Sequence, residues 1–99
     1  MARFDLHDRP EKDGYYLDCQ SHLLRDLTTR FVVPVLKPEF APKPAGRLNP
    51  SFVIDGELFI MVTQFAGTIP KRELKTVAGS LIDHDVSILA AIDVLISGY

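Results

Sequence analysis

The chain has no tryptophan and a single cysteine, Cys19, among its 99 residues. One cysteine excludes an internal disulfide and is typical of a protein in a reducing compartment. No apolar run reaches the about 20 residues that a membrane-spanning helix needs. The N-terminal MARFDLHDRP also lacks the apolar centre of a signal peptide. These absences predict a cytoplasmic protein with no membrane partner.

The chain also has little excess charge of either sign. Lys and Arg total 11 against 13 for Asp and Glu, which gives a net charge of −2. A protein that binds nucleic acid directly usually carries a clear positive excess, so we expect no direct specific nucleic-acid binding. A chain of this length has room for one modest core, which predicts a single domain over residues 1–99.

Motifs for catalysis, metal binding and cofactor binding are scarce. The glycines are isolated and match neither the dinucleotide nor the P-loop spacing. Cys19 and His22 have a Cys-x-x-His spacing, but no second pair follows to complete a zinc site. Ser21, His22 and Asp26 lie close in sequence, where a polar loop is the simpler interpretation. The sequence predicts no metal ion and no cofactor, and it offers little support for catalysis.

Short apolar alternations predict about six strands, mostly antiparallel. We place them at residues 3–6, 15–20, 30–36, 51–62 (two strands) and 65–69. Asp55-Gly56 is a preferred pair for a tight hairpin turn. Segment 30–36 is apolar on both faces, which predicts a strand covered on two sides with Pro34 at an edge or bulge. Residues 37–50 form a proline-rich loop, and residues 71–81 could hold a short turn of helix.

The C-terminal segment predicts one helix. Asp83 is a candidate N-cap, Asp85 falls in the first turn, and the helix runs to about Ser97. A mainly β chain that ends in one helix fits a small barrel or a folded sheet carrying that helix.

This predicted helix is too apolar for a surface helix with one buried face. Only five of its 14 residues from His84 to Ser97 are polar. We expect one group to pack on the core, namely Ile88, Ile92, Leu95 and Ile96. A second group would then point elsewhere, namely Val86, Leu89, Ala90 and Val94. A second apolar partner is implied, most simply another copy of the chain, and we assign Val94 and Leu95 to that dimer interface.

Four segments together resemble the CcdB family of toxins from bacterial toxin–antitoxin modules. They are LDCQS (17–21), RFVVPV (30–35), RLNPSFVIDGELFIMVTQFAGTIP (47–70) and AAIDVLISGY (90–99). The resemblance implies an SH3-like barrel with a C-terminal helix, assembled as a homodimer. It implies a protein without catalysis of its own that binds the A subunit of DNA gyrase and stabilises the cleaved gyrase–DNA complex.

The resemblance also implies where the partners bind. Its gyrase-contacting positions correspond to Leu23, Leu24, Asp93, Ile96, Ser97, Gly98 and Tyr99. Ser97 stands where the family's Trp-Gly-Ile ending has tryptophan, so a cation–π contact of about 0.5–2 kcal/mol is lost. A CcdA-like antitoxin with an acidic, disordered tail would neutralise the toxin. Cations that could receive this tail are Arg9, Lys12, Lys37 and Lys43.

Two alternatives remain open. A MazF-type endoribonuclease shares the barrel, although the Arg-Gly-Asp opening of that family is missing between Met1 and Asp8. A non-toxic CcdB-like dimer that has lost gyrase binding would keep the fold with an altered tail.

Overall fold

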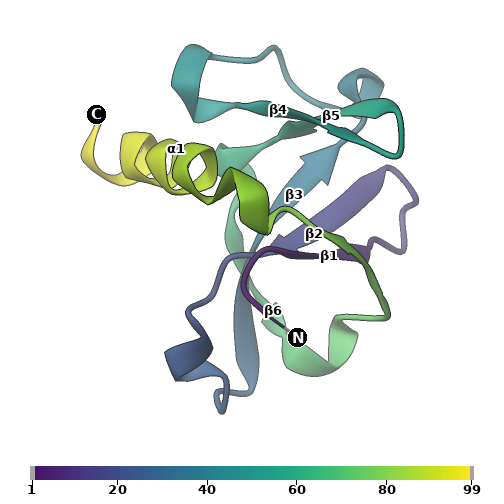
Figure 1. Cartoon of the computed structure of the whole chain (residues 1–99), viewed down its shortest axis with the longest axis vertical. Helices are drawn as coiled ribbons and strands as arrows, with labels where there is room; N and C mark the ends of the chain where they lie inside the picture. The colour runs from purple at the N-terminus through teal and green to yellow at the C-terminus, as the bar shows by residue number, and fades with distance from the viewer. Residues whose placement is uncertain (1, 99) are drawn as a thin grey trace.

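Within residues 2–98, the chain forms seven short strands and one C-terminal helix, connected by loops and by short 3-10 turns (Figure 1). The computed structural model describes residues 2–98. The strands are β1 (Asp5–Asp8), β2 (Gly14–Asp18), β3 (Thr29–Leu36), β4 (Ser51–Ile54), β5 (Glu57–Met61), β6 (Gly67–Pro70) and β7 (Val77–Ser80). The 3-10 turns are η1 (His22–Leu24), η2 (Pro38–Phe40), η3 (Gly46–Leu48), η4 (Thr63–Phe65), η5 (Lys71–Glu73) and η6 (Ile82–His84), and the helix is α1 (Asp85–Ser97).

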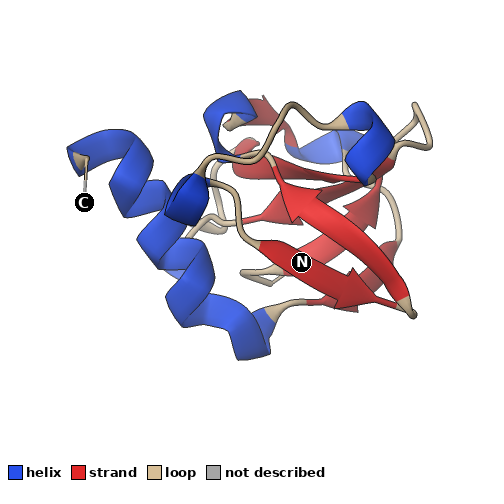
Figure 2. Cartoon of the chain, turned by 90° about the horizontal axis from the view of Figure 1, so that it is seen from above, coloured by secondary structure: helices blue, strands red, loops and turns tan. Residues whose placement is uncertain are grey.

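The strands form one antiparallel sheet in the order β4-β5-β3-β2-β1-β7, and β6 also pairs with β3. The sheet curls into a half-barrel, and α1 runs along one side of it (Figure 2). The predicted mainly β fold with a C-terminal helix is therefore confirmed.

The central strand β3 pairs with three other strands. One side of β3 pairs with β2, while its other side pairs first with β6 through residues 29–32 and then with β5 through residues 35–36. Pro34 lies where the second partner changes, and its carbonyl accepts a hydrogen bond from the Val62 amide at 2.9 Å. The missing N–H of proline therefore faces a break in the pairing. Pro34 lies in a central strand, not at the edge or bulge that we predicted.

The core fills the space between the curled sheet and α1. Its fully buried members include Leu17, Val33 and Val35, which alternate along β2 and β3 as the sequence predicts. The rest of the cluster is Phe4, Leu6, Phe52, Phe59, Met61, Leu81, Ile88 and Ala91. Val32 and Leu36 on the opposite face of β3 are also buried, so this strand is covered on both sides.

Local turn chemistry places the β4–β5 hairpin as predicted. Asp55 and Gly56 have φ values of 53° and 79°, and Ile54 pairs with Glu57 across the turn. Positive φ at both central residues is the requirement that Asp-Gly meets.

Strand β7 was not predicted. Within residues 71–81 the structure has a 3-10 turn at Lys71–Glu73, but Val77–Ser80 pairs with β1 and forms an edge of the sheet. The sequence VAGS has low intrinsic strand preference, so pairing with β1 decides its conformation.

The structure confirms the predicted end of α1 but not its predicted N-cap. Asp83 is not the N-cap, because Ile82–His84 forms a 3-10 turn and α1 begins at Asp85, whose carboxylate accepts from the Val86 amide at 2.9 Å. The helix ends at Ser97 as predicted. Gly98 follows with φ 79°, and its amide donates to the Val94 carbonyl at 3.0 Å. Within residues 2–98, no helix has the length and apolar content needed to cross a membrane.

Candidate protein-binding site

The last turns of α1 extend beyond the sheet (Figure 1). Ile88 is completely buried and Ile92 is partly buried, so the first half of the helix packs on the core as predicted. Leu95 is 43% exposed and Ile96 is 75% exposed, so the expectation that these two residues pack on the core is wrong. They share the face of Ile88 and Ile92, but the helix has passed the edge of the sheet at their positions.

The helix end therefore presents apolar side chains to solvent next to polar ones. Asp93, Ser97 and Gly98 are exposed, and Val94 is half-buried. Exposed aliphatic side chains beside a carboxylate suit a protein partner better than a small ligand. Tyr99, the last predicted contact residue, lies outside the described residues.

The predicted leucine pair forms a second exposed apolar group. Leu23 is 78% exposed and Leu24 is 51% exposed. Both lie in η1, which Ser21 caps: its hydroxyl accepts from the Leu23 amide at 3.2 Å, and its carbonyl accepts from the Leu24 amide at 3.0 Å. The segment QSHLLRDLTT thus contains a single capped 3-10 turn and neither a strand nor an α-helix.

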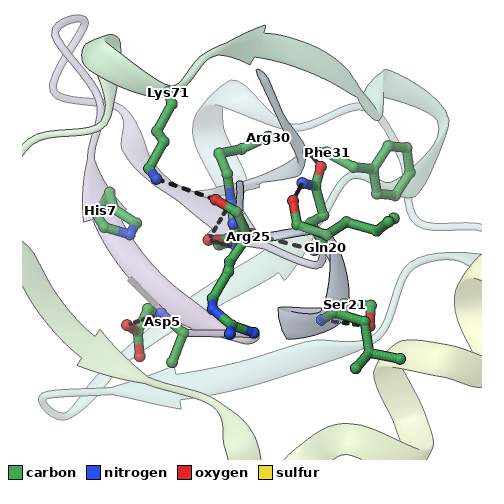
Figure 3. A network of polar contacts seen from close by, with 12 residues as sticks. Asp5, His7, Gln20, Ser21, Arg25, Arg30, Phe31 and Lys71 are labelled. Carbon is green, nitrogen blue, oxygen red and sulfur yellow. Dashed lines mark hydrogen bonds and ion pairs between the residues drawn. The ribbon is translucent and has the colours of Figure 1, made fainter. Parts of the chain in front are cut away.

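Gln20 holds this turn to the barrel (Figure 3). Its side-chain amide donates to the Leu24 carbonyl at 3.0 Å, and its side-chain oxygen accepts from the Phe31 amide at 2.9 Å. Its own backbone amide donates to the Asp18 carboxylate at 3.1 Å. Gln20 is buried, so these bonds form away from bulk water and fix the position of Leu24.

A buried ion pair supports Gln20. Arg30 and Asp18 are both inaccessible to solvent, and the guanidinium Nη2 and Nε donate to Asp18 Oδ2 at 2.7 and 3.0 Å. The sequence analysis did not predict this pair, because Asp18 and Arg30 lie 12 residues apart in two different strands. The signal was present in the strand register: Asp18 pairs with Val32, which makes Arg30 its diagonal neighbour on the same face.

The fold does not bring the two exposed groups together within one chain. Helix α1 packs mainly on η3, η4 and η6, and Figure 1 shows η1 and the helix end at separate places. One protomer therefore offers two distinct apolar surfaces, the helix end and the leucine pair.

Other candidate sites give no support for catalysis. Within residues 2–98, no hydrogen bond joins the side chains of Ser21, His22 and Asp26, and the Ser21 hydroxyl is used as a cap. Burial, with a smaller contribution from the Asp18 carboxylate, raises the pKa of the Cys19 thiol from 9.0 to about 12. Such a thiol stays protonated at neutral pH and is a poor nucleophile. The described part of the chain contains no group of three or more His, Cys, Asp or Glu side chains that could hold a metal ion.

The sequence matches the protein family described as CcdB protein over residues 3–98. The chain belongs to the CcdB family. This match covers all but three residues of the 99-residue chain. Comparison with curated proteins gives no significant match. Membership in the CcdB family makes the chain a toxin of a toxin–antitoxin module.

The cations predicted to receive the antitoxin of this CcdB-family toxin differ in their present contacts. Arg9 Nε donates to Asp13 Oδ1 at 2.7 Å, and Lys37 Nζ lies 3.7 Å from Glu57 Oε2. Neither Lys12 nor Lys43 forms an ion pair within the described range 2–98. An open cavity of about 430 Å³ is lined by Asp8, Arg9, Pro10, Lys12, Gly14, Tyr15, Lys37, Glu57 and Phe59. Arg9, Lys12 and Lys37 thus lie around one hollow, whereas Lys43 does not line it.

Proposed function

We propose that this CcdB-family toxin binds the A subunit of DNA gyrase and stabilises gyrase on cleaved DNA, as a poison without catalysis of its own. The observation that carries the proposal is the exposure of Ile96 on a helix end that extends past the sheet. An aliphatic side chain that is three-quarters exposed gains from burial against a partner, at about 25 cal/mol per Å² of apolar surface.

Binding would use the helix end and the leucine pair together. Ile96 supplies apolar contact, and the exposed Asp93 one turn earlier supplies a carboxylate that can accept hydrogen bonds or pair with a cation. Leu23 and Leu24 supply a second contact that Gln20 has already positioned, so less conformational entropy is lost on binding. Ser97 cannot stack on an arginine, and we therefore expect weaker binding than from a tryptophan-ending toxin.

A homodimer would cover the rest of the apolar helix. Val94 is half-buried and Leu95 is 43% exposed in one copy of the chain, directly beside the proposed gyrase contacts. Pairing with a second copy removes these side chains from water. It also supplies a second helix end and a second leucine pair, so one gyrase subunit could contact surfaces that are separate in a single protomer.

The antitoxin would be a CcdA-like protein with an acidic tail that folds on binding. Lys12 supplies an unpaired charge at the rim of the 430 Å³ cavity, whereas Arg9 and Lys37 would have to exchange their present carboxylate partners. A toxin of chromosomal gyrase acts in the cytoplasm, and we propose that location.

Controlled expression in bacteria tests the proposal against its two alternatives. We expect growth arrest with broken chromosomal DNA and intact cellular RNA, relieved by co-expression of the antitoxin. Arrest with cleaved RNA and intact DNA would instead establish an endoribonuclease. Normal growth, with the folded protein present at a high level, would indicate a non-toxic member of the family.

A further inference from the structure

Two loops that are distant in sequence are joined at one end of the barrel. The Lys71 amide donates to the Thr28 carbonyl at 2.8 Å, and Lys71 Nζ donates to the Arg25 carbonyl at 3.1 Å (Figure 3). Leu74 is buried, and the buried His7 ring lies with Nδ1 2.7 Å from the Lys75 carbonyl oxygen. Residues 71–75 are thereby held against residues 25–28 at the Lys71 end and against His7 of β1 at the Lys75 end.

The joined loops carry an excess of positive charge. Their cations are Arg25, Lys71, Arg72 and Lys75, and their acids are Asp26 and Glu73. Four positive and two negative charges give a local formal charge of +2 in a chain whose net charge is −2. Across residues 2–98, none of these six side chains takes part in an ion pair. The positive charge is therefore not neutralised within the chain.

The same loops surround an open hollow of about 530 Å³, lined by Thr28, Lys71, Arg72 and Leu74. An ammonium group has three N–H donors, and Lys71 uses one of them on the Arg25 carbonyl. Its other donors, the Arg72 guanidinium and the Thr28 hydroxyl are the groups that most often contact phosphate oxygens in protein–DNA complexes. The hollow is thus lined by donors suited to a phosphate group.

The position of this surface relates it to the proposed gyrase contact. Arg25 directly follows Leu24, so the cationic loops continue the surface of the leucine pair. We propose that the surface formed by Arg25, Thr28, Lys71, Arg72 and Lys75 contacts the phosphate backbone of the DNA that gyrase holds. The contact is independent of base sequence. That gyrase supplies the DNA rests on the proposed function. The ability of the surface to bind phosphate does not depend on it.

Binding to free DNA tests the surface without gyrase. The variant Arg72→Glu with Lys75→Glu leaves the Lys71 contacts intact. The matched control, Lys43→Glu with Arg47→Glu, makes the same charge change in the loop of residues 37–50. All four side chains are exposed, so both variants should fold, which circular dichroism checks. Fluorescence anisotropy with a short labelled duplex at low salt measures affinity and its salt dependence.

We expect wild type and the control to bind the duplex, and the Arg72/Lys75 variant to bind at least about tenfold more weakly. Its plot of log affinity against log salt should be shallower by about 0.9 for each lost phosphate contact. Absence of duplex binding by the wild type, or equal loss in both variants, would overturn the proposal.

A second arm uses gyrase. The Arg72/Lys75 variant should bind the DNA-free A subunit as the wild type does, yet trap less cleaved DNA. If the variant loses A-subunit binding as strongly as it loses trapping of cleaved DNA, these cations contact the gyrase protein and our proposal is wrong. If the wild type fails to bind the A subunit, the proposed function is wrong, whereas the duplex experiment still decides the phosphate surface.

Discussion

Asp18 and Arg30 form a buried, two-point ion pair at the junction of β2 and β3, with Nη2 2.7 Å from Oδ2. The same carboxylate accepts the Gln20 amide, and the Gln20 side chain holds the Leu24 carbonyl. An element of the core therefore determines where an exposed binding residue lies. The position of the leucine pair therefore depends on the interior of the barrel.

Breaking the ion pair should cost more than replacing it. We expect Arg30→Ala to lower the free energy of unfolding by about 3–5 kcal/mol, because an unpaired carboxylate would stay buried. The apolar double variant Asp18→Leu with Arg30→Met should lose less than this single variant. Urea unfolding of the three proteins measures the difference. A double variant less stable than Arg30→Ala would show that the pair itself, rather than its unpaired charge, carries the stability.

Leu23→Ser should separate binding from folding. Leu23 is 78% exposed, so we expect unfolding free energy to change by less than about 0.5 kcal/mol. Affinity for the gyrase A subunit should fall by more than about 1 kcal/mol, or roughly fivefold, because a central apolar contact is lost. Isothermal titration calorimetry measures the affinity of the wild type and of the variant for the A subunit. The control Val53→Ser removes an apolar side chain that is 68% exposed on the β4–β5 hairpin, and its affinity should be unchanged. Equal affinity for wild type and the Leu23 variant would remove η1 from the binding site.

Leu95→Asp, or Val94→Asp, should disrupt the dimer. A carboxylate buried without a partner in the interface costs several kcal/mol. Light scattering after size exclusion should show a dimeric wild type and a monomeric variant at the same concentration. Val53→Asp adds the same charge on the β4–β5 hairpin, outside the last turns of α1, and should remain dimeric. Intact dimers of both helix variants would place the interface elsewhere.

The Cys19 thiol should resist modification until the protein unfolds. Its pKa is raised from 9.0 to about 12, so the reactive thiolate is scarce in the folded state at pH 8. The unfolded chain loses this proton near pH 9 while the folded chain keeps it to about pH 12, so stability should fall as pH rises between these values. Cys19→Ala should weaken that decline. Rapid labelling by a thiol reagent in native buffer would contradict the partly buried, protonated state.

Features with local causes were predictable from the sequence, and features with distant causes were not. The Asp55-Gly56 turn and the helix end at Ser97 were predicted correctly because each depends on residues close by in the chain. Strand β7 was missed because its partner β1 lies about 70 residues earlier in the chain.

The same distinction applies to the candidate site. The apolar excess of α1 was visible, but the exposure of Leu95 and Ile96 depends on where the sheet ends beneath the helix. Helical periodicity describes the face of a residue and carries no information about the length of the surface beneath it. The link from Asp18 through Gln20 to Leu24 required the register of β2 against β3.

The most direct test of gyrase poisoning is a cleavage assay with purified gyrase, ATP and supercoiled plasmid. The intact chain is compared with a version that lacks Gly98 and Tyr99. We predict that linear DNA accumulates with the intact toxin, at lower potency than with a tryptophan-ending toxin, and that it disappears on truncation. No accumulation with the intact protein across several bacterial gyrases, or equal accumulation with the truncated protein, would contradict gyrase poisoning through the helix end.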